Sequence, residues 1–168
     1  CKALTDAAIV HVAENCANLA ELCTFTQITD ESIIAVAENC AQLTSLEIVR
    51  CENITDAALI TLATKCHRLT RLYAEYCPNL TDTSIIHVVE KCSGLEALSV
   101  GGCWRLTDRC VRAIAENCAY VDELFIGECK IVTDIVSVAE KCVHLLDVDV
   151  KECGDLPDES LADLAKNC

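Results

Sequence analysis

Residues 51–76 read CENITDAALITLATKCHRLTRLYAEY, and residues 77–102 read CPNLTDTSIIHVVEKCSGLEALSVGG. Aligned on their first cysteine, the two stretches share a Thr-Asp pair, an apolar run, a second cysteine and a short alternating segment. The chain therefore contains an internal repeat of 26 residues. A period of this length is typical of proteins in which similar structural units stack one upon the next.

The Thr-Asp pair marks this repeat along the whole chain. It occurs six times, at intervals of 24, 26, 26, 26 and 26 residues, and a degenerate seventh copy has Pro157 in place of threonine. We therefore expect a single domain over residues 1–168, which is a piece of a longer chain. The predicted units are 1–24, 25–50, 51–76, 77–102, 103–128, 129–152 and a partial 153–168.

Each unit combines the periodicity of a helix with that of a strand. In the first unit Ile9, Val12, Ala13 and Cys16 are spaced i, i+3, i+4, i+7, which predicts an amphipathic helix beginning at the Thr-Asp pair, where an N-cap belongs. A short alternating stretch such as Leu46-Glu47-Ile48 then predicts a strand with one buried face. Helices of about ten residues are unstable alone and must pack on their neighbours. The sequence therefore predicts an α/β solenoid, with parallel strands on one side and helices on the other.

Two joints depart from the repeat. The first unit lacks two residues before the next helix and has Thr24 where an aliphatic residue is expected. In the sixth unit the interval from Thr133 to Cys142 is nine residues rather than eleven, so its helix should be shortened. We expect these two joints to be the least regular parts of the fold.

The units resemble the leucine-rich repeat, whose pattern is L-x-x-L-x-[LI]-x-x-C. They are most similar to the cysteine-containing subclass, which is found in F-box ubiquitin-ligase receptors and in antagonist-of-mitotic-exit-network proteins. This resemblance implies a leucine-rich-repeat solenoid of about 6.5 repeats, with a concave sheet face and a convex helix face. The matching residues are Leu43, Leu46, Ile48 and Cys51, and again Leu95, Leu98, Val100 and Cys103.

The resemblance also implies a function. It suggests substrate recognition for an SCF-type E3 ubiquitin ligase, in which other subunits catalyse and a flanking domain outside these residues reaches the ligase adaptor. The alternative is a scaffold or regulatory protein that does not serve a ligase, such as a cytoskeletal protein, a signalling protein or a microbial effector. Fold alone does not decide between them.

The charge and hydropathy of the chain limit the kinds of partner that it is expected to bind. The chain has 13 basic and 27 acidic residues, a net charge of −14, which argues against nucleic acid and against an anionic membrane surface. Its 52% of hydrophobic residues excludes a disordered chain. We find no apolar run of about 18 residues and no secretory leader pattern. The interpretation of the cysteines as thiols outside disulfides, given next, predicts a reducing compartment, so we expect a cytoplasmic or nuclear protein.

The 15 cysteines fall mainly on two repeat positions. Cys1, Cys51, Cys77, Cys103, Cys129 and Cys153 follow the strands; Cys16, Cys40, Cys66, Cys92, Cys118 and Cys142 end the helices, as does Cys168; Cys23 and Cys110 lie elsewhere. We interpret them as free, buried thiols that donate to backbone carbonyls left unpaired by each coil. A disulfide framework or a zinc site is less favoured, because no C-x-x-C occurs and one thiol per coil does not gather four ligands.

We find no pattern that points to catalysis, a cofactor or a metal. The four histidines are scattered, and G-x-S-x-G, G-x-x-x-x-G-K and H-E-x-x-H are absent from the sequence. We therefore expect no enzyme, no cofactor and no metal site. The function should come from the surface that the repeats present.

Side chains that alternate with the buried strand positions should line the concave face. Among them Tyr73 and Phe125 flank a smooth unit containing Ser99 and Gly101, and large aromatic side chains are favoured binding anchors. We predict that a protein or peptide with basic residues docks there, across units three to five. The predicted binding residues are Glu47, Arg71, Tyr73, Glu75, Ser99, Phe125 and Asp149, with Arg50, Tyr76, Trp104 and Arg105 at the rim.

Overall fold

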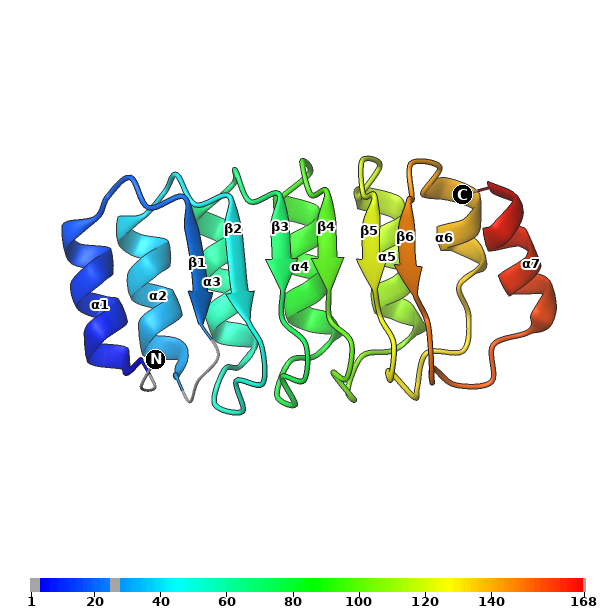
Figure 1. Ribbon diagram of the computed structural model, residues 1–168, viewed down its shortest axis with the longest axis horizontal. Helices are drawn as coiled ribbons and strands as arrows, with labels where there is room; N and C mark the ends of the chain where they lie inside the picture. Colours follow the sequence, from blue (N-terminus) through cyan, green and yellow to red (C-terminus); the bar gives the residue numbers. More distant parts are fainter. Residues whose placement is uncertain (1–3, 25–27, 168) are drawn as a thin grey trace.

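The computed structural model describes residues 4–24 and 28–167, in which helices and strands alternate along the chain (Figure 1). In Figure 1 the strands lie side by side in front of a layer of helices. The elements are α1 (Asp6–Asn15), β1 (Glu21–Thr24), α2 (Asp30–Asn39), β2 (Ser45–Ile48), α3 (Asp56–Lys65), β3 (Arg71–Tyr73), α4 (Asp82–Lys91), β4 (Ala97–Ser99), α5 (Asp108–Asn117), β5 (Glu123–Phe125), α6 (Val136–Lys141), β6 (Asp147–Asp149) and α7 (Asp158–Asn167).

The strands form one parallel sheet of six, in the order of the sequence. Each strand pairs with the next in the register of the repeat, so that Leu46 stands beside Leu72 and Leu98 beside Leu124. These leucines point into the core between the sheet and the helices and are fully buried. The arrangement confirms the predicted parallel α/β solenoid and its assignment of inward-facing positions.

The threonine of each Thr-Asp pair caps a helix, as predicted. Thr5, Thr29, Thr55, Thr81 and Thr107 are the N-cap residues of α1 to α5. In all but the first, the threonine side chain accepts a hydrogen bond from a backbone N–H in the first turn. This cap satisfies one of the N–H groups that the start of a helix leaves unpaired.

The aspartate of the pair connects neighbouring units, a role that the sequence pattern does not reveal. Asp82 Oδ1 accepts from the backbone N–H of Thr107 at 2.8 Å, and its Oδ2 accepts from the Thr107 hydroxyl at 2.6 Å. Each aspartate thus joins the start of its own helix to the start of the next. The same two bonds join Asp6 to Thr29, Asp30 to Thr55, Asp56 to Thr81 and Asp108 to Thr133.

This Asp–Thr ladder ends where the repeat degenerates. Pro157 occupies the place of the next threonine and offers neither an N–H nor a hydroxyl. The preceding aspartate, Asp134, instead accepts from the N–H of Val136 in its own unit at 3.0 Å. The sixth helix is also the short one, with six residues and no side-chain cap, as the shortened interval predicted. Of the first joint, residues 25–27, including Phe25, lie outside the described residues, and Thr24 is buried.

The cysteines form two ladders of thiols, and donation to a backbone carbonyl is confirmed for Cys40, Cys51, Cys66, Cys77, Cys92, Cys103, Cys129 and Cys153. The expectation that these carbonyls are otherwise unpaired is wrong for some of them, since the Cys40 carbonyl also accepts from the N–H of Leu43. After the strands, Cys77 Sγ donates to the carbonyl of Ile48 at 3.0 Å, and Cys103 Sγ donates to that of Ala74 at 3.2 Å. Burial is the main reason why the pKa of the Cys103 thiol rises to about 12. The other bonds of the ladders run from Cys129 to Val100, Cys153 to Ile126, Cys40 to Cys16, Cys66 to Cys40 and Cys92 to Cys66.

None of the thirteen cysteines among the described residues is assigned to a disulfide, and Cys1 and Cys168 lie outside those residues. Two of the thirteen, Cys16 and Cys23, are exposed, so the expectation of burial is wrong for them. Cys16 ends the first helix, and no earlier described helix covers it.

Within the described residues, no helix has the length and hydropathy needed to cross a membrane.

Removing one rung of the Asp–Thr ladder should weaken the fold. We expect Asp82→Ala to lower the free energy of unfolding by about 1.5–3 kcal/mol, because the N–H and hydroxyl of Thr107 lose a charged acceptor. Urea denaturation measures this difference. Glu90→Ala, which removes an exposed carboxylate from the same helix, is the matched control and should change stability by less than about 0.5 kcal/mol. Equal stability of the two variants would contradict a coupling role for Asp82.

The ladder should also make stability depend on acid pH. Burial by itself would raise the pKa of Asp108, but hydrogen bonds from Thr133 and Asp134 and the charge of Arg112 together hold it below its ordinary value. A carboxyl group with a lowered folded-state pKa stabilises the fold above its unfolded pKa of about 3.9 and loses this effect as the pH falls through the folded pKa. We expect Asp108→Asn to be less stable than the parent near neutral pH and to lose less stability on acidification. Urea midpoints measured from neutral to acid pH test this, and parallel curves would contradict it.

Candidate functional site

The pairing of the strands arranges the outward-facing side chains of the sheet into columns. We call Cys23, Glu47, Tyr73, Ser99, Phe125 and Asp149 the first column, because strand pairing places each beside the next. Two residues further along each unit from β2 to β6 lies the second column, which consists of Val49, Glu75, Gly101, Gly127 and Lys151. The smallest residue of the first column is Ser99 on β4, and the smallest of the second are Gly101 and Gly127, which follow β4 and β5.

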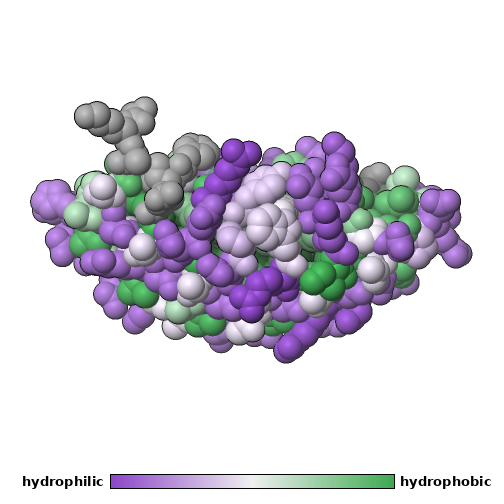
Figure 2. Space-filling model, turned by 90° about the horizontal axis from the view of Figure 1, so that it is seen from below, coloured by the Kyte–Doolittle hydropathy of each residue, from purple (hydrophilic) through white to green (hydrophobic). Residues whose placement is uncertain are grey.

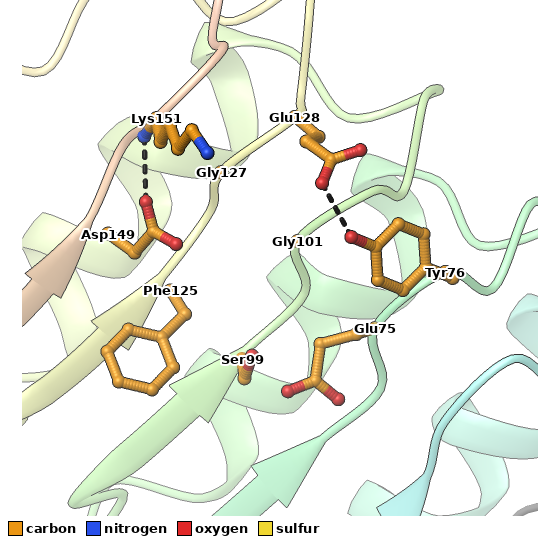
Figure 3. A pocket seen from close by; sticks show the side chains of 9 residues that line it. All are labelled: Glu75, Tyr76, Ser99, Gly101, Phe125, Gly127, Glu128, Asp149 and Lys151. Carbon is orange, nitrogen blue, oxygen red and sulfur yellow. Dashed lines mark hydrogen bonds between the residues drawn. The ribbon is translucent and has the colours of Figure 1, made fainter.

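A hollow occupies the place of the missing side chains. It has a volume of about 140 Å³ and lies where strands β3 to β6 end. Figure 3 shows Ser99 between Glu75 and Phe125, with Asp149 and Lys151 on one side and Tyr76 and Glu128 on the other. We call this cavity the Ser99 hollow. Its lining is Glu75, Tyr76, Ser99, Gly101, Phe125, Gly127, Glu128, Asp149 and Lys151.

Tyr76 forms one wall of the hollow and is held on both sides. A Cβ atom at Gly102 would lie 2.4 Å from Cδ1 of Tyr76, so the ring occupies space that only a glycine leaves. The Tyr76 hydroxyl donates to Glu128 Oε1 at 2.5 Å, and this bond is the main reason why the pKa of Tyr76 is raised. The guanidinium carbon of Arg50 lies 5.4 Å from the centroid of the ring. A second, wider hollow, lined by Glu47, Val49, Arg50, Glu75 and Tyr76, adjoins the first.

Three residues that line the two hollows share an unusual backbone conformation. Arg50, Tyr76 and Glu128 have φ of 58°, 55° and 60°, although none is a glycine. This left-handed turn recurs directly before each cysteine from Cys51 to Cys153. Because the turn recurs, Tyr76 and Glu128 project from equivalent places two units apart, and their side chains can meet above Gly102.

Tyr73 crosses the sheet rather than lining the hollow. Its hydroxyl donates to Glu123 Oε2 at 3.1 Å, which spans from β3 over β4 to β5. Ala97 and Ser99, on the strand between, are 1% and 0% exposed. Burial is the main cause of the raised pKa of Tyr73, with the Glu123 hydrogen bond next. The smooth unit predicted from the sequence is thus partly covered by the aromatic side chain that was expected to flank it.

Of the predicted site residues, the structure gathers Glu75, Tyr76, Ser99, Phe125 and Asp149 around the Ser99 hollow. Glu47 and Arg50 line the wider hollow beside it. Arg71 stands apart, paired with Glu96 at 3.6 Å, and Trp104 and Arg105 are exposed and line neither cavity.

The predicted set missed Glu128 and Lys151. Lys151 belongs to a column that the strand register defines, so the register could have found it. Glu128 occupies the same left-handed turn position as Arg50 and Tyr76. Those two residues were predicted at the rim because one is basic and the other aromatic. The position, rather than the residue type, is what places these side chains at the hollow.

The lining is acidic, and part of it is unpaired. Glu75, Glu128 and Asp149 supply three carboxylates against one ammonium, that of Lys151. Among the described residues, Glu75 Oε2 and Ser99 Oγ are buried and lack any hydrogen-bond partner. Figure 2 faces the side at which the strands end, where hydrophilic side chains predominate and hydrophobic ones are scattered. No group of three or more His, Cys, Asp or Glu residues in the described ranges is placed to hold a metal ion.

Comparison with known proteins supports the fold. The sequence matches no protein-family model and no curated protein. Among solved structures, Rad7 from a crystal structure of the yeast Rad7 and Elc1 complex shares 18% identity at a TM-score of 0.52; the match covers 99% of this chain but 60% of that one. The tropomodulin C-terminal domain of Caenorhabditis elegans shares 12% identity at a TM-score of 0.58, with 96% and 90% coverage. Internalin C2 from Listeria monocytogenes matches at 18% identity, 96% and 80% coverage and a TM-score of 0.47.

The six-stranded parallel sheet with its alternating helices, together with the similarity to the tropomodulin C-terminal domain, defines the fold. The fold is an α/β leucine-rich-repeat solenoid.

The first column makes one prediction about reactivity. The exposed Cys23 donates to Glu47 Oε2 at 3.0 Å, and burial together with this bond and the Glu47 charge raises the pKa of Cys23 to about 11. We expect Glu47→Gln to speed alkylation of Cys23 by iodoacetamide at mildly alkaline pH, because the thiolate is the reacting form. Peptide mass spectrometry measures the rate, with exposed Cys16 as the internal reference. Glu38→Gln, on the exposed surface of α2, is the control, and a rate equal to that of the control would contradict the prediction.

Proposed function

We propose that this chain is a recognition module that binds a protein or peptide on the concave face of the solenoid, across units three to five, without catalysing a reaction. The observation that carries the proposal is the Ser99 hollow. It lies at the point of the sheet face where an otherwise regular repeat loses its side chains, and it is bordered by two aromatic rings, Tyr76 and Phe125. Aromatic anchors and pockets near the centre of a surface are where binding energy concentrates.

The charge of the face defines the chemistry of the partner. The first and second columns contain Glu47, Glu75 and Asp149, and Glu123 and Asp147 lie at the start of β5 and β6. Basic groups on the same face are few, and Arg71 is engaged by Glu96. Complementary charge speeds association and discriminates between partners, so we propose a partner segment that carries basic residues.

We further propose that the module recognises substrates for an SCF-type E3 ubiquitin ligase. The support is the cysteine-containing repeat pattern, in which the thiols of Cys77 and Cys103 donate to the preceding coil. The similar fold of Rad7, which was crystallised in complex with the protein Elc1, is consistent with this assignment. Contact with a ligase adaptor would come through a flanking domain. Unpaired, buried thiols suit a reducing compartment, which is the cytoplasm or the nucleus.

A scaffold or regulatory protein without a ligase is the second candidate. The observation that favours it is the tropomodulin C-terminal domain, of which the match covers 90% at a TM-score of 0.58. The two candidates share the binding face and differ in what happens to the bound partner. A receptor for a ligase shortens the lifetime of its partner, whereas a scaffold does not.

Partner binding should depend on the aromatic residues of the face. We expect Tyr73→Ala combined with Phe125→Ala to abolish co-purification of the partner, because it removes one aromatic ring of the hollow, Phe125, and the Tyr73 side chain that crosses over Ser99. Affinity capture from cells by the full-length protein, with quantitative mass spectrometry, measures this loss. Leu98→Ala is the comparison for stability rather than for binding: it truncates a buried core residue and should lower the free energy of unfolding by about 2–5 kcal/mol. Retained binding by the double variant would overturn the proposed face.

A second measurement with the same double variant separates the ligase receptor from the scaffold. Once the partner is identified, its half-life is measured in cells that lack the protein and in cells that express either the parent or the double variant. Under the ligase proposal the half-life lengthens without the protein and is restored by the parent alone. An unchanged half-life would overturn the ligase assignment in favour of the scaffold.

A further inference from the structure

Two polar atoms in the Ser99 hollow have no partner although they are buried. Ser99 is 0% exposed, and its Oγ lines the hollow without a hydrogen bond to any described residue. Glu75 Oε2 is in the same condition on the adjacent wall. Buried polar groups without partners are costly and uncommon in native proteins. A carboxylate oxygen can only accept, so the group that satisfies Glu75 must be a donor.

The other carboxylates of the hollow are already fixed in place. Glu128 accepts from the hydroxyl of Tyr76, and Asp149 Oδ1 accepts from the backbone N–H of Lys151 at 2.8 Å. The ammonium of Lys151 lies 3.9 Å from Glu152, and its side chain is 80% exposed. The one cation of the lining is therefore directed to solvent and to Glu152, and the excess of negative charge favours a cationic occupant.

The size and walls of the hollow select the form of this cation. A volume of about 140 Å³ is close to that of a cavity that admits benzene, about 150 Å³. It holds the end of one side chain rather than a length of peptide. Tyr76 and Phe125 offer aromatic rings, on which a cation is stabilised. The Tyr76 ring already has the guanidinium of Arg50 beside it, 5.4 Å from its centroid.

We propose that the Ser99 hollow receives the guanidinium group of an arginine on the docking protein. This proposal rests on the proposed function, since it names the residue type that the binding face recognises. The planar guanidinium has several donors in fixed directions, so it can reach Glu75 Oε2 and Ser99 Oγ together while it lies against an aromatic ring. A lysine ammonium lacks this fork, and the described residues provide no cluster suited to a bare metal ion.

The test uses a probe and does not require the partner. The isotope-labelled chain is titrated with N-acetyl-arginine amide, and the backbone resonances of Gly101 and Gly127, which line the hollow, are followed by NMR. We expect saturable shifts with the arginine probe and at least about tenfold weaker binding of N-acetyl-citrulline amide, its uncharged isostere, and of N-acetyl-lysine amide. No saturable shift, or equal binding of the three probes, would overturn the proposal.

Variants of the hollow give a second readout. We expect Glu75→Gln to weaken the arginine probe by about tenfold or more, since it removes the charge of the acceptor. Its urea midpoint should stay level or rise, because the substitution neutralises a carboxylate oxygen that has no partner. Glu90→Gln, on helix α4, is the matched control and should leave probe binding unchanged. Probe binding by Glu75→Gln equal to that of the control would overturn the proposal.

The outcomes also separate this proposal from the proposed function. If the Tyr73→Ala and Phe125→Ala double variant loses the partner while Glu75→Gln retains it fully, the face binds protein and the arginine assignment is wrong. If the arginine probe binds but the double variant keeps its partner, the hollow is a cation site and the docking face lies elsewhere. Loss of the partner in both variants, together with probe selectivity, supports both proposals.

Discussion

The carboxylate of one aspartate in each of the first five units joins that unit to the next. Asp82 begins its own helix, where its negative charge suits the helix dipole, and it also accepts two hydrogen bonds from Thr107 at the start of the following helix. Helices of about ten residues have little stability alone, so this contact and the packing between coils order them together. Since the contact repeats from α1 to α5, it couples successive coils in the same way, and the strands pair in register.

The thiol ladders perform a related task on the other side of each coil. Each of these thiols adds a donor to a carbonyl of the preceding coil, as Cys66 does to the Cys40 carbonyl, which also accepts from the N–H of Leu43. Cysteine is small and apolar and carries a weak donor, so Cys77 can fill the core and still reach the carbonyl of Ile48. Serine has the stronger donor but would bury a more polar group, and alanine has no donor. The residue type therefore follows from the geometry of a buried turn rather than from metal or disulfide chemistry.

The sequence was sufficient for the periodic features and insufficient for contacts that cross units. Alternation around Leu46 and Leu98 predicted the inward and outward faces, and the shortened interval before Cys142 predicted the short sixth helix. The crossing of Tyr73 over β4 was not predictable, because it depends on a hydrogen bond to Glu123 two strands away and on the small residues Ala97 and Ser99 of the strand between. For the same reason Tyr76 was assigned to a rim, although it forms a wall over Gly102.

The Ser99 hollow follows from these aperiodic residues acting on a periodic frame. The frame places equivalent positions of neighbouring units side by side, so a large residue leans over the next unit only where that unit has a small one. Gly102 admits the ring of Tyr76, and Ser99 and Gly101 leave the space beneath. A larger side chain at Ser99 would fill the hollow, and any side chain at Gly102 would meet the ring of Tyr76. Neither position belongs to the ladders that hold the coils together. The residues that hold the coils together thus differ from those of the proposed binding site, so such a site can vary in a repeat whose fold stays constant.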